Sequence, residues 1–391
     1  MSDELIPTLG DKTPLMVADT PSIDLLAKKS EIGLAHTIPQ GMKPGSDTAN
    51  LSVLGYDPKI YYTGRSPLEA LSIGVDMKDT DIALRCNFVT LSEEESYENK
   101  TIIDHSSGEI STDDAAILLK AVRDELENDI YKYYLGTSYR HLTIWQSGEV
   151  VPLKEPHDIL GKTIGKYLPK NTALKDMMIK SYDILNEHPL NIQRSKNGLN
   201  KANSIWFWGA GTRPALSSFE EKNNKKGAMI SAVDLLKGIA VGAGMKVITV
   251  PGANGTLHTN YEGKASAALD VLLKQNYDFV YVHVEAPDEM GHQGSIENKI
   301  KAIENLDQRV IKPVVEGMEA SGEEYRMLIM PDHPTPIHLR THTSDPVPYL
   351  LYDSRINKNN NCLYNEIDAI CSGNIILKGY NIIDRLFDKG E

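Results

Sequence analysis

Short apolar runs bounded by turn residues alternate, over most of this chain, with longer segments of helical period. The runs at 203–211, 278–284 and 325–330 have the length and flanks of buried strands. The segments at 263–276 and 297–322 repeat apolar residues every three or four positions, as amphipathic helices do. Strands that alternate with helices predict an α/β fold with a doubly wound, mostly parallel sheet and helices on both faces.

Residues 81–185 have a different character, because turn residues are denser and no predicted strand there ends in ligand-like side chains. Strands are predicted at 81–91 and 139–147, on either side of a helix at 111–127 that begins with Ser/Thr and early acids. We interpret 81–185 as a smaller α+β domain inserted into a discontinuous domain made of 1–80 and 186–391.

Composition and charge narrow the class of protein. A hydrophobic content of 41% and a charged content of 24% over 391 residues are ordinary for a soluble protein with a large core. The net charge of −13 argues against nucleic-acid binding, so an anionic ligand would need a local cluster of cations. Cys86, Cys362 and Cys371 have neither disulfide density nor zinc spacing, which indicates a reducing compartment. No signal-like start and no apolar run of about 18 residues is present. We expect a cytoplasmic protein without a membrane partner, and homo-oligomerisation is left open.

Ligand-like side chains follow two of the predicted strands. Asp332 and His333 come directly after 325–330, and His342 follows on a Pro-rich loop that can fold back over the strand end. Asp288 and His292 come after 278–284, and their spacing of four puts both on one helical face. Ligands bind at the carboxyl ends of strands in α/β sheets, and carboxylates with imidazoles are metal ligands. Taken alone, Asp332 is also explained as a helix N-cap, and His333 and His342 as surface histidines. The two clusters together predict a metal site.

Ser46 is the candidate nucleophile. Gly41, Pro44 and Gly45 form a tight loop, after which Ser46 opens a predicted helix that ends at Gly55. The free N–H groups at a helix N-terminus suit a phosphate, and a nearby metal lowers the pKa of a hydroxyl. Taken alone, Ser46 is also explained as an ordinary N-cap.

A third group of side chains fits a small substrate that carries a phosphate and a carboxylate. Guanidinium groups bind both anions in a bidentate manner. Each member is also explained singly as a surface charge or an ion-pair partner. The group, which falls near predicted strand ends or turns, comprises Arg85, Arg140, His141, His157, Asp158, Arg194, Arg213 and Lys226.

Motifs along almost the entire chain carry a resemblance to a known family. They include KTPLMVADTPSIDLLA, PGSDTANLSVLGYDP, YRHL, PHDILGK, HPLNIQRSKNG, WFWGAG, KGAMISAVDLLKGIA, NYEGKA, EAPDEMGHQG, PDHPTP and THTSDPVPYLLYD. With these motifs the sequence resembles the archaeal-type cofactor-independent (2,3-bisphosphoglycerate-independent) phosphoglycerate mutases of the alkaline phosphatase superfamily. The resemblance implies a metal-dependent, alkaline phosphatase-like domain that carries an inserted substrate-binding domain.

The resemblance also implies the chemistry. Ser46 matches the nucleophile of the PGSD motif and would form a phosphoserine intermediate with the phosphoryl group of 3-phosphoglycerate. Return of that group to the 2-oxygen of glycerate would give 2-phosphoglycerate, a step of glycolysis and gluconeogenesis. In the inserted domain, Arg85, Arg140, His157 and Asp158 would hold the glycerate.

Two divalent ions are implied by the same resemblance. Asp288, His292 and His342 match the ligands of one ion, and Asp332, His333 and Ser46 match those of the second. The implied ion is Mn²⁺, with Mg²⁺, Zn²⁺ and Co²⁺ as alternatives, and 2,3-bisphosphoglycerate is not required.

The sequence departs from the family pattern at several points. Glu155 and Ala210 stand where the family has Pro and Gln, which affects the substrate contacts. Family members open with an apolar strand and a GDGM-like turn whose Asp is a ligand of the second ion. This sequence opens beyond that turn, and Asp3 is a poor substitute for the ligand. A truncated start or a weakened second metal site would each explain this.

Two alternatives to a mutase remain from the sequence. EAPDEMGHQG, LRTHTSDPVPYLLYD and GKASAALD look most like a branch of the family proposed as homoserine kinases, which would act in threonine biosynthesis. A Walker-type nucleotide loop is absent from the sequence, so a kinase would bind its nucleotide differently. The other alternative is a degenerate metal-binding scaffold.

Overall fold

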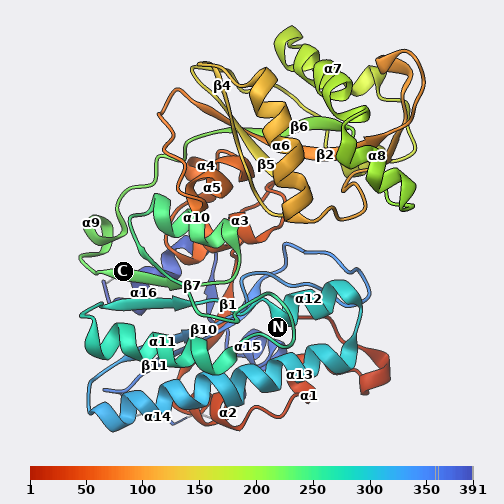
Figure 1. The fold of residues 1–391 in the computed structure, drawn as a ribbon. Coiled ribbons are helices and arrows are strands. Elements are labelled where there is room, and N and C mark those ends of the chain that lie inside the picture. Colours follow the sequence, from red (N-terminus) through yellow and green to blue (C-terminus); the bar gives the residue numbers. More distant parts are fainter. Residues whose placement is uncertain (357, 360, 390–391) are drawn as a thin grey trace. The chain divides into compact units, whose positions relative to one another are not determined.

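The computed structural model describes residues 1–356, 358–359 and 361–389, and its internal contacts divide the chain into two units (Figure 1). Unit 1 comprises Met1–Tyr62 and Leu216–Glu391, and unit 2 is the inserted segment Thr63–Ala215. The chain is thus a mixed α/β protein, as predicted.

The inserted unit extends beyond the predicted boundaries of 81–185 at both ends. On the amino side, α5 (Arg65–Ser72) packs on the strands of unit 2. On the carboxyl side, β6 (Ser204–Thr212) pairs antiparallel with β2 (Ile82–Leu91) along nearly its whole length. The run at 203–211 is therefore a strand, but the prediction that it belongs to the larger domain is wrong. Its partner strand could not be identified from local sequence.

One sheet of unit 1 is parallel and has helices on both faces. Its order is β8-β7-β9, with β7 at Gly227–Ile230, β8 at Lys246–Ile248 and β9 at Phe279–Val282. In Figure 1, α10 (Asp234–Gly242) lies on one side of this sheet and α11 (Tyr261–Lys274) on the other. Helix α12 (Ala286–Gln293) follows β9.

The second sheet of unit 1 is mostly antiparallel. Its order is β10-β11-β1-β12, with β10 at Arg326–Ile329, β11 at Val347–Asp353, β1 at Glu31–Ala35 and β12 at Ile375–Ile376. Strand β11 runs antiparallel to both β10 and β1, whereas β12 is parallel to β1. The prediction of a single, mostly parallel sheet is therefore wrong for this part of unit 1. The connection from β10 to β11 is a loop without a crossover helix, and parallel neighbours need such a crossover.

The other helical segments of unit 1 surround these two sheets. They are η1 (Pro7–Leu9), α1 (Pro14–Val17), α2 (Pro21–Ala27), α3 (Ser46–Val53), α4 (Pro58–Tyr61), α9 (Phe219–Asn223), α13 (Ile296–Leu306), η5 (Asp307–Ile311), α14 (Lys312–Ser321), α15 (Glu366–Cys371), η6 (Gly379–Asn381) and α16 (Ile382–Leu386).

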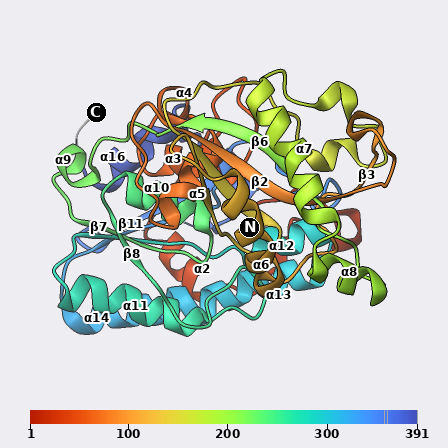
Figure 2. The ribbon, with the colours of Figure 1, turned by 45° about the horizontal axis from the view of Figure 1, so that its top comes forward.

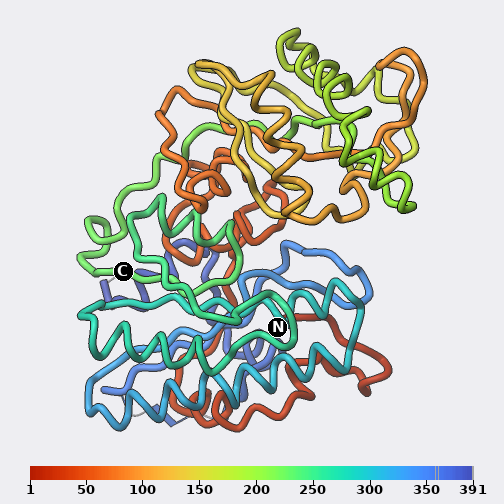
Figure 3. Tube along the Cα trace, viewed as in Figure 1, coloured from red at the N-terminus to blue at the C-terminus, as the bar shows by residue number. Residues whose placement is uncertain are grey.

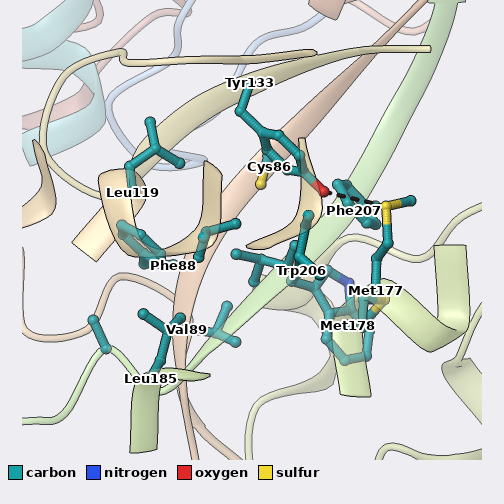
Figure 4. Packing of buried hydrophobic residues seen from close by; sticks show 14 of the residues in the cluster. Cys86, Phe88, Val89, Leu119, Tyr133, Met177, Met178, Leu185, Trp206 and Phe207 are labelled. Atoms are coloured by element: carbon teal, nitrogen blue, oxygen red, sulfur yellow. Dashed lines mark hydrogen bonds between the residues drawn. The ribbon is translucent and has the colours of Figure 1, made fainter. Parts of the chain in front are cut away.

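Unit 2 is built on an antiparallel sheet in the order β3-β2-β5-β4, and β6 also pairs with β2, beside which it lies in Figure 2. Buried Phe88, Leu119 and Trp206 lie in its core, where the hydroxyl of Tyr133 donates to Met177 Sδ at 3.2 Å (Figure 4). The remaining elements are η2 (Tyr97–Asn99), β3 (Ile102–Asp104), α6 (Thr112–Leu126), β4 (Tyr131–Tyr134), β5 (Arg140–Trp145), η3 (Pro156–Ile159), η4 (Gly165–Tyr167), α7 (Thr172–Asn186) and α8 (Pro189–Lys196).

The amino-terminal segment is held by a buried ion pair. Figure 3 traces this red segment along α13, and Lys299 Nζ of α13 lies 2.7 Å from Asp3 Oδ2. Both side chains are almost fully buried, and Lys299 also donates to the carbonyl oxygens of Ser2 and Thr335. Asp3 is therefore a structural anion, whose carboxylate is paired with Lys299.

Replacing Asp3 by alanine is expected to lower the free energy of unfolding by about 3–5 kcal/mol, because the ammonium of Lys299 loses its buried counter-charge. Chemical denaturation monitored by circular dichroism measures this. The matched control is Glu4→Ala, which removes a half-exposed carboxylate next to Asp3 and should cost about 1 kcal/mol or less. Equal losses for the two variants would contradict the role given to Asp3.

Candidate active site

Ser46 is the first residue of α3 and points at the end of β10. Its hydroxyl oxygen lies 3.0 Å from His333 Nε2. Gly45, which precedes it, is fully extended, so the chain turns into the helix at the serine itself. The predicted helix and its end at Gly55 are confirmed, since α3 ends at Val53 and Gly55 has a positive φ. Ser46 is half-buried.

Asn50 joins Ser46 to Asp332. Its amide nitrogen donates to the backbone carbonyl of Ser46 and to Asp332 Oδ2, both at 2.8 Å. Its amide oxygen accepts a hydrogen bond of 2.5 Å from the hydroxyl of Tyr281 on β9. Sequence reasoning missed Asn50 and Tyr281. The available signal for Asn50 was a polar residue four positions after Ser46, and so on the same face of the predicted helix.

A carboxylate and three histidines meet at the end of β9. Asp288 Oδ2 lies 3.3 Å from His292 Nε2, and Asp288 Oδ1 lies 3.4 Å from His342 Nε2. Helix α12 confirms the predicted four-residue spacing of Asp288 and His292. Thr335, another residue missed from sequence, donates its hydroxyl hydrogen to Asp288.

These donors fit a metal ion. Asp288, His333 and His342 each offer a ligand atom, and the three atoms lie within 4.8 Å of one another. His292 Nε2 is 2.9 Å from His342 Nε2, while its Nδ1 faces the carbonyl oxygen of Arg340 at 3.0 Å. The Arg340 carbonyl accepts a hydrogen bond from the Nδ1–H, which orients the ring so that Nε2 points into the cluster. The structure thus brings His333 next to Asp288 and His342, although the resemblance assigns them to separate ions.

The electrostatics of this cluster favour a charged carboxylate. Burial alone would raise the pKa of Asp288, but hydrogen bonds from His292 and His342 hold it well below its ordinary value. The hydrogen bond to Asp288 raises the pKa of His292 to about 9. Burial lowers the pKa of His333, which favours the neutral form of that imidazole.

In unit 2, several of the predicted substrate-binding residues contact one another through aromatic rings and guanidinium groups. The guanidinium of Arg85 lies 4.5 Å from the ring centre of Trp208, whose ring is in turn 5.6 Å from that of His157. Arg85 is also paired with Glu69, and Asp158 lies next to Lys154.

These contacts continue through a residue that sequence reasoning missed. The ring of His105 lies 6.2 Å from that of His157 and 5.9 Å from that of Tyr139. The exposed guanidinium of Arg140 lies 5.2 Å from the Tyr139 ring centre. We call Arg85, His105, Tyr139, Arg140, His157 and Trp208 the unit 2 cluster.

Two predicted substrate contacts are internal instead. His141 is buried against Phe88, accepts a hydrogen bond from the backbone N–H of Gly136, and has its pKa lowered to about 3 by burial. Arg194 is buried and pairs with Asp114 at 2.8 Å. We correct both to structural residues, because their polar groups face the interior of unit 2.

Two further predicted contacts lie apart from these clusters. Arg213 is half-exposed and lies 3.8 Å from Asp79. Lys226 precedes the first residue of β7, whereas the polar cluster follows the last residue of the parallel strand β9. Lys226 therefore lies at the amino ends of these parallel strands, opposite the ends where the polar cluster lies. We correct it to a surface lysine.

Unit 1 thus brings a serine at a helix N-terminus to aspartates and histidines at strand ends, which is the arrangement of a metal-assisted group-transfer enzyme. A family model of 2,3-bisphosphoglycerate-independent phosphoglycerate mutase matches residues 27–191. A probable enzyme of that name from Geobacter sulfurreducens is 46% identical over 397 aligned residues, which cover 100% of this chain and 98% of the relative. The Methanosarcina barkeri enzyme is 50% identical over 357 residues, covering 90% and 88%. The chain belongs to the 2,3-bisphosphoglycerate-independent phosphoglycerate mutase family.

Two solved structures are similar to this chain over its whole length. A protein from Pyrococcus horikoshii superimposes with a TM-score of 0.83 at 30% identity, over 100% of this chain and 96% of its own. The cofactor-independent phosphoglycerate mutase from Thermoplasma acidophilum DSM 1728 superimposes with a TM-score of 0.68 at 27% identity, over 100% and 97%. Among the described residues, no helix is both long and apolar enough to cross a membrane.

Proposed function

We propose that unit 1 carries the phosphoryl-transfer site of a phosphoglycerate mutase and that Ser46 is its nucleophile. The protein is an isomerase that interconverts 3-phosphoglycerate and 2-phosphoglycerate. The observation that carries the residue assignment is the contact of Ser46 Oγ with His333 Nε2 at 3.0 Å, at the end of β10. We also propose an alkaline phosphatase-like, doubly wound arrangement for unit 1, which the parallel sheet β8-β7-β9 with helices on both faces supports.

The reaction at Ser46 proceeds in two transfers. In the first, Ser46 Oγ gives up its proton and attacks the phosphorus of 3-phosphoglycerate, the bond from phosphorus to the 3-oxygen breaks, and the glycerate 3-oxygen takes up a proton in exchange. In the second, the 2-oxygen of glycerate gives up its proton and attacks the phosphorus of the phosphoserine, the bond from phosphorus to Oγ breaks, and Ser46 Oγ takes up a proton. The hydrogen bond to His333 Nε2 directs the Ser46 proton away from the attacking lone pair. Ser46 is the first residue of α3, and backbone N–H groups at a helix N-terminus would favour the phosphoryl charge.

The charged side chains around Ser46 would hold two divalent ions, for which we propose Mn²⁺. Asp288, His292 and His342 would hold one, and Asp332, His333 and Ser46 the other. Bound ions neutralise the phosphoryl charge and lower the pKa of the serine hydroxyl. Asn50 fixes the position of Asp332 relative to the first turn of α3, because its amide nitrogen donates hydrogen bonds to both.

The decisive experiment is an assay of the purified chain with Mn²⁺ and 3-phosphoglycerate, without nucleotide and without 2,3-bisphosphoglycerate. Formation of 2-phosphoglycerate, detected by ³¹P NMR, is the expected result. A parallel reaction offers ATP with homoserine. Phosphohomoserine without 2-phosphoglycerate would overturn the assignment and support the kinase alternative, and inactivity in both would support an inert scaffold.

We further propose that the unit 2 cluster binds the glycerate portion of the substrate. Arg85 is already paired with Glu69, whereas Arg140 is exposed, so Arg140 is the better probe of a carboxylate contact. Arg140→Gln is expected to raise KM for 3-phosphoglycerate by about tenfold or more, with a smaller change in kcat, because a charge-assisted hydrogen bond is lost.

The matched control for Arg140 is Arg123→Gln on α6. Arg123 is also an exposed arginine of unit 2, but it is paired with Glu127 in a helical ion pair. Steady-state kinetics on both variants give the comparison. An unchanged KM for the Arg140 variant would remove this residue from the substrate site.

A further inference from the structure

Two polar side chains lie on or next to a strand of the parallel sheet of unit 1, where apolar residues are the rule. Strand β9 is in a sheet with helices on both faces, and strands of such sheets are usually almost entirely apolar. Tyr281 of β9 and His283, the first residue after it, point to the same face, because side chains alternate along an extended chain. The hydroxyl of Tyr281 and the imidazole of His283 therefore need hydrogen-bond partners inside unit 1.

The two residues have different partners. His283 Nδ1 lies 3.3 Å from the hydroxyl oxygen of Ser231, which directly follows the neighbouring strand β7. Tyr281 instead donates its hydroxyl hydrogen to Asn50 Oδ1 of α3, at 2.5 Å. Burial raises the pKa of Tyr281, and the negative charge of Asp332 raises it further, so this hydroxyl keeps its proton. Tyr281 thus connects the parallel sheet to the helix that begins with Ser46.

Asn50 is fully buried, and both ends of its amide group are engaged. The nitrogen donates to the carbonyl oxygen of Ser46 and to Asp332 Oδ2, while the oxygen accepts from Tyr281. A reversed amide would place its oxygen against the Ser46 carbonyl and the Asp332 carboxylate, which are both acceptors. The Tyr281 hydroxyl favours the observed orientation, because it supplies a donor on the oxygen side. One amide group therefore fixes Ser46, Asp332 and β9 relative to one another.

Asp332 is held by its own surroundings as well. The buried hydroxyl of Thr37 donates to the backbone carbonyl of Asp332 at 2.6 Å, and Asp332 Oδ1 accepts from the backbone N–H of His333 at 3.0 Å. The backbone of Ser46 is joined to this carboxylate through Asn50. Group transfer requires the attacking oxygen to be in line with the bond that breaks, and a misplacement of about 1 Å can lower the rate about a hundredfold.

We propose that Tyr281 is a positioning residue for the nucleophile, which holds Ser46 at a fixed distance from Asp332 through the amide group of Asn50. This inference rests on the proposed role of Ser46 in the phosphoglycerate mutase reaction. Because Tyr281 acts through Asn50, its loss should lower kcat and leave KM for 3-phosphoglycerate unchanged.

Steady-state kinetics on a double-mutant cycle test this chain of contacts. Tyr281→Phe, which removes a single oxygen atom, is expected to lower kcat about tenfold with KM within about twofold of the wild type. Asn50→Ala should lower kcat about a hundredfold, and the double variant should match Asn50→Ala alone, because Tyr281 has no route to Ser46 once Asn50 is gone. Losses that multiply in the double variant would overturn the proposal.

The matched control is Tyr364→Phe. Tyr364 is also buried in unit 1, and its hydroxyl donates to the backbone carbonyl of Pro348 at 2.9 Å. The control should lower Tm about as much as Tyr281→Phe does, while its kcat stays within about twofold of the wild type. An equal fall of kcat in the two variants would show that activity follows stability and would overturn the positioning role.

Hydrogen exchange on the chain without added metal or substrate tests the same contacts independently of activity. Tyr281→Phe should speed amide exchange in residues 46–53 of α3 about fivefold, whereas Tyr364→Phe should leave exchange there unchanged. Unchanged exchange in the Tyr281 variant would overturn the proposal. A wild-type chain that does not convert 3-phosphoglycerate would instead contradict the proposed function, and the exchange result would then decide by itself whether Tyr281 holds the start of α3.

Discussion

Replacing Ser46 by alanine is expected to lower kcat for the conversion of 3-phosphoglycerate by at least about a thousandfold, because the phosphoryl acceptor is lost. The free energy of unfolding should change by about 1 kcal/mol or less, since Ser46 is half-buried and contributes one side-chain hydrogen bond, to His333. Mass spectrometry of the wild-type protein, quenched during turnover, should find a phosphoryl group on the peptide that contains Ser46. The alanine variant should show none.

The matched control for Ser46 is Ser52→Ala in the same helix. Ser52 is fully buried in α3, and its hydroxyl has no hydrogen-bond partner among the described residues. Its replacement should leave kcat within about twofold of the wild type, because no group near the reacting atoms changes. Retention of mutase activity by the Ser46 variant would contradict the phosphoserine mechanism, whatever the control shows.

Replacing Asp288 by asparagine is expected to lower both metal content and activity. The substitution keeps the size of the side chain but removes the charge shared by His292 and His342, at 3.3 and 3.4 Å. Activity should fall by more than about a hundredfold at a fixed Mn²⁺ concentration, and more Mn²⁺ should recover part of it. Elemental analysis of the dialysed protein gives the metal content, and titration of activity with Mn²⁺ gives the affinity.

The control for Asp288 is Glu289→Gln, the next residue of α12. Glu289 accepts a hydrogen bond from Gln293 at the surface and contacts none of the three histidines in the described structure. Its variant should keep the metal content and activity of the wild type. An Asp288 variant that retains full metal content with normal activity would show that this carboxylate is not a ligand.

The site was largely predictable because its residues follow strands directly. Asp332 and His333 were expected at the end of 325–330, and Asp288 and His292 on a helical turn after 278–284, and the structure has both. Position after a strand is a local property, which periodicity and turn residues reveal. The same logic failed for Lys226, because a residue near a turn can lie at either end of a strand.

Residues that act through hydrogen bonds were not predictable in this way. Asn50, Tyr281 and Thr335 contact the site from a helix interior, a strand interior and a loop, and each carries an ordinary polar side chain. Conversely, His141 and Arg194 look like anion-binding residues but face the core of unit 2. Whether a polar side chain faces a ligand or the interior depends on packing by distant segments.

By itself, the sequence determined strands β9 and β10, helices α11, α13 and α14, the order of the polar clusters and the helix that begins at Ser46. These follow from hydrophobic period, from glycine and proline at turns and from the position of polar residues after apolar runs, all of which act over a few residues. Only the tertiary structure decided that β10 pairs antiparallel with β11, that β6 belongs to unit 2 and that His333 lies beside Asp288. Strand partners and side-chain burial depend on contacts between segments far apart in the chain, and a local pattern carries no information about which edge or which core a segment will meet.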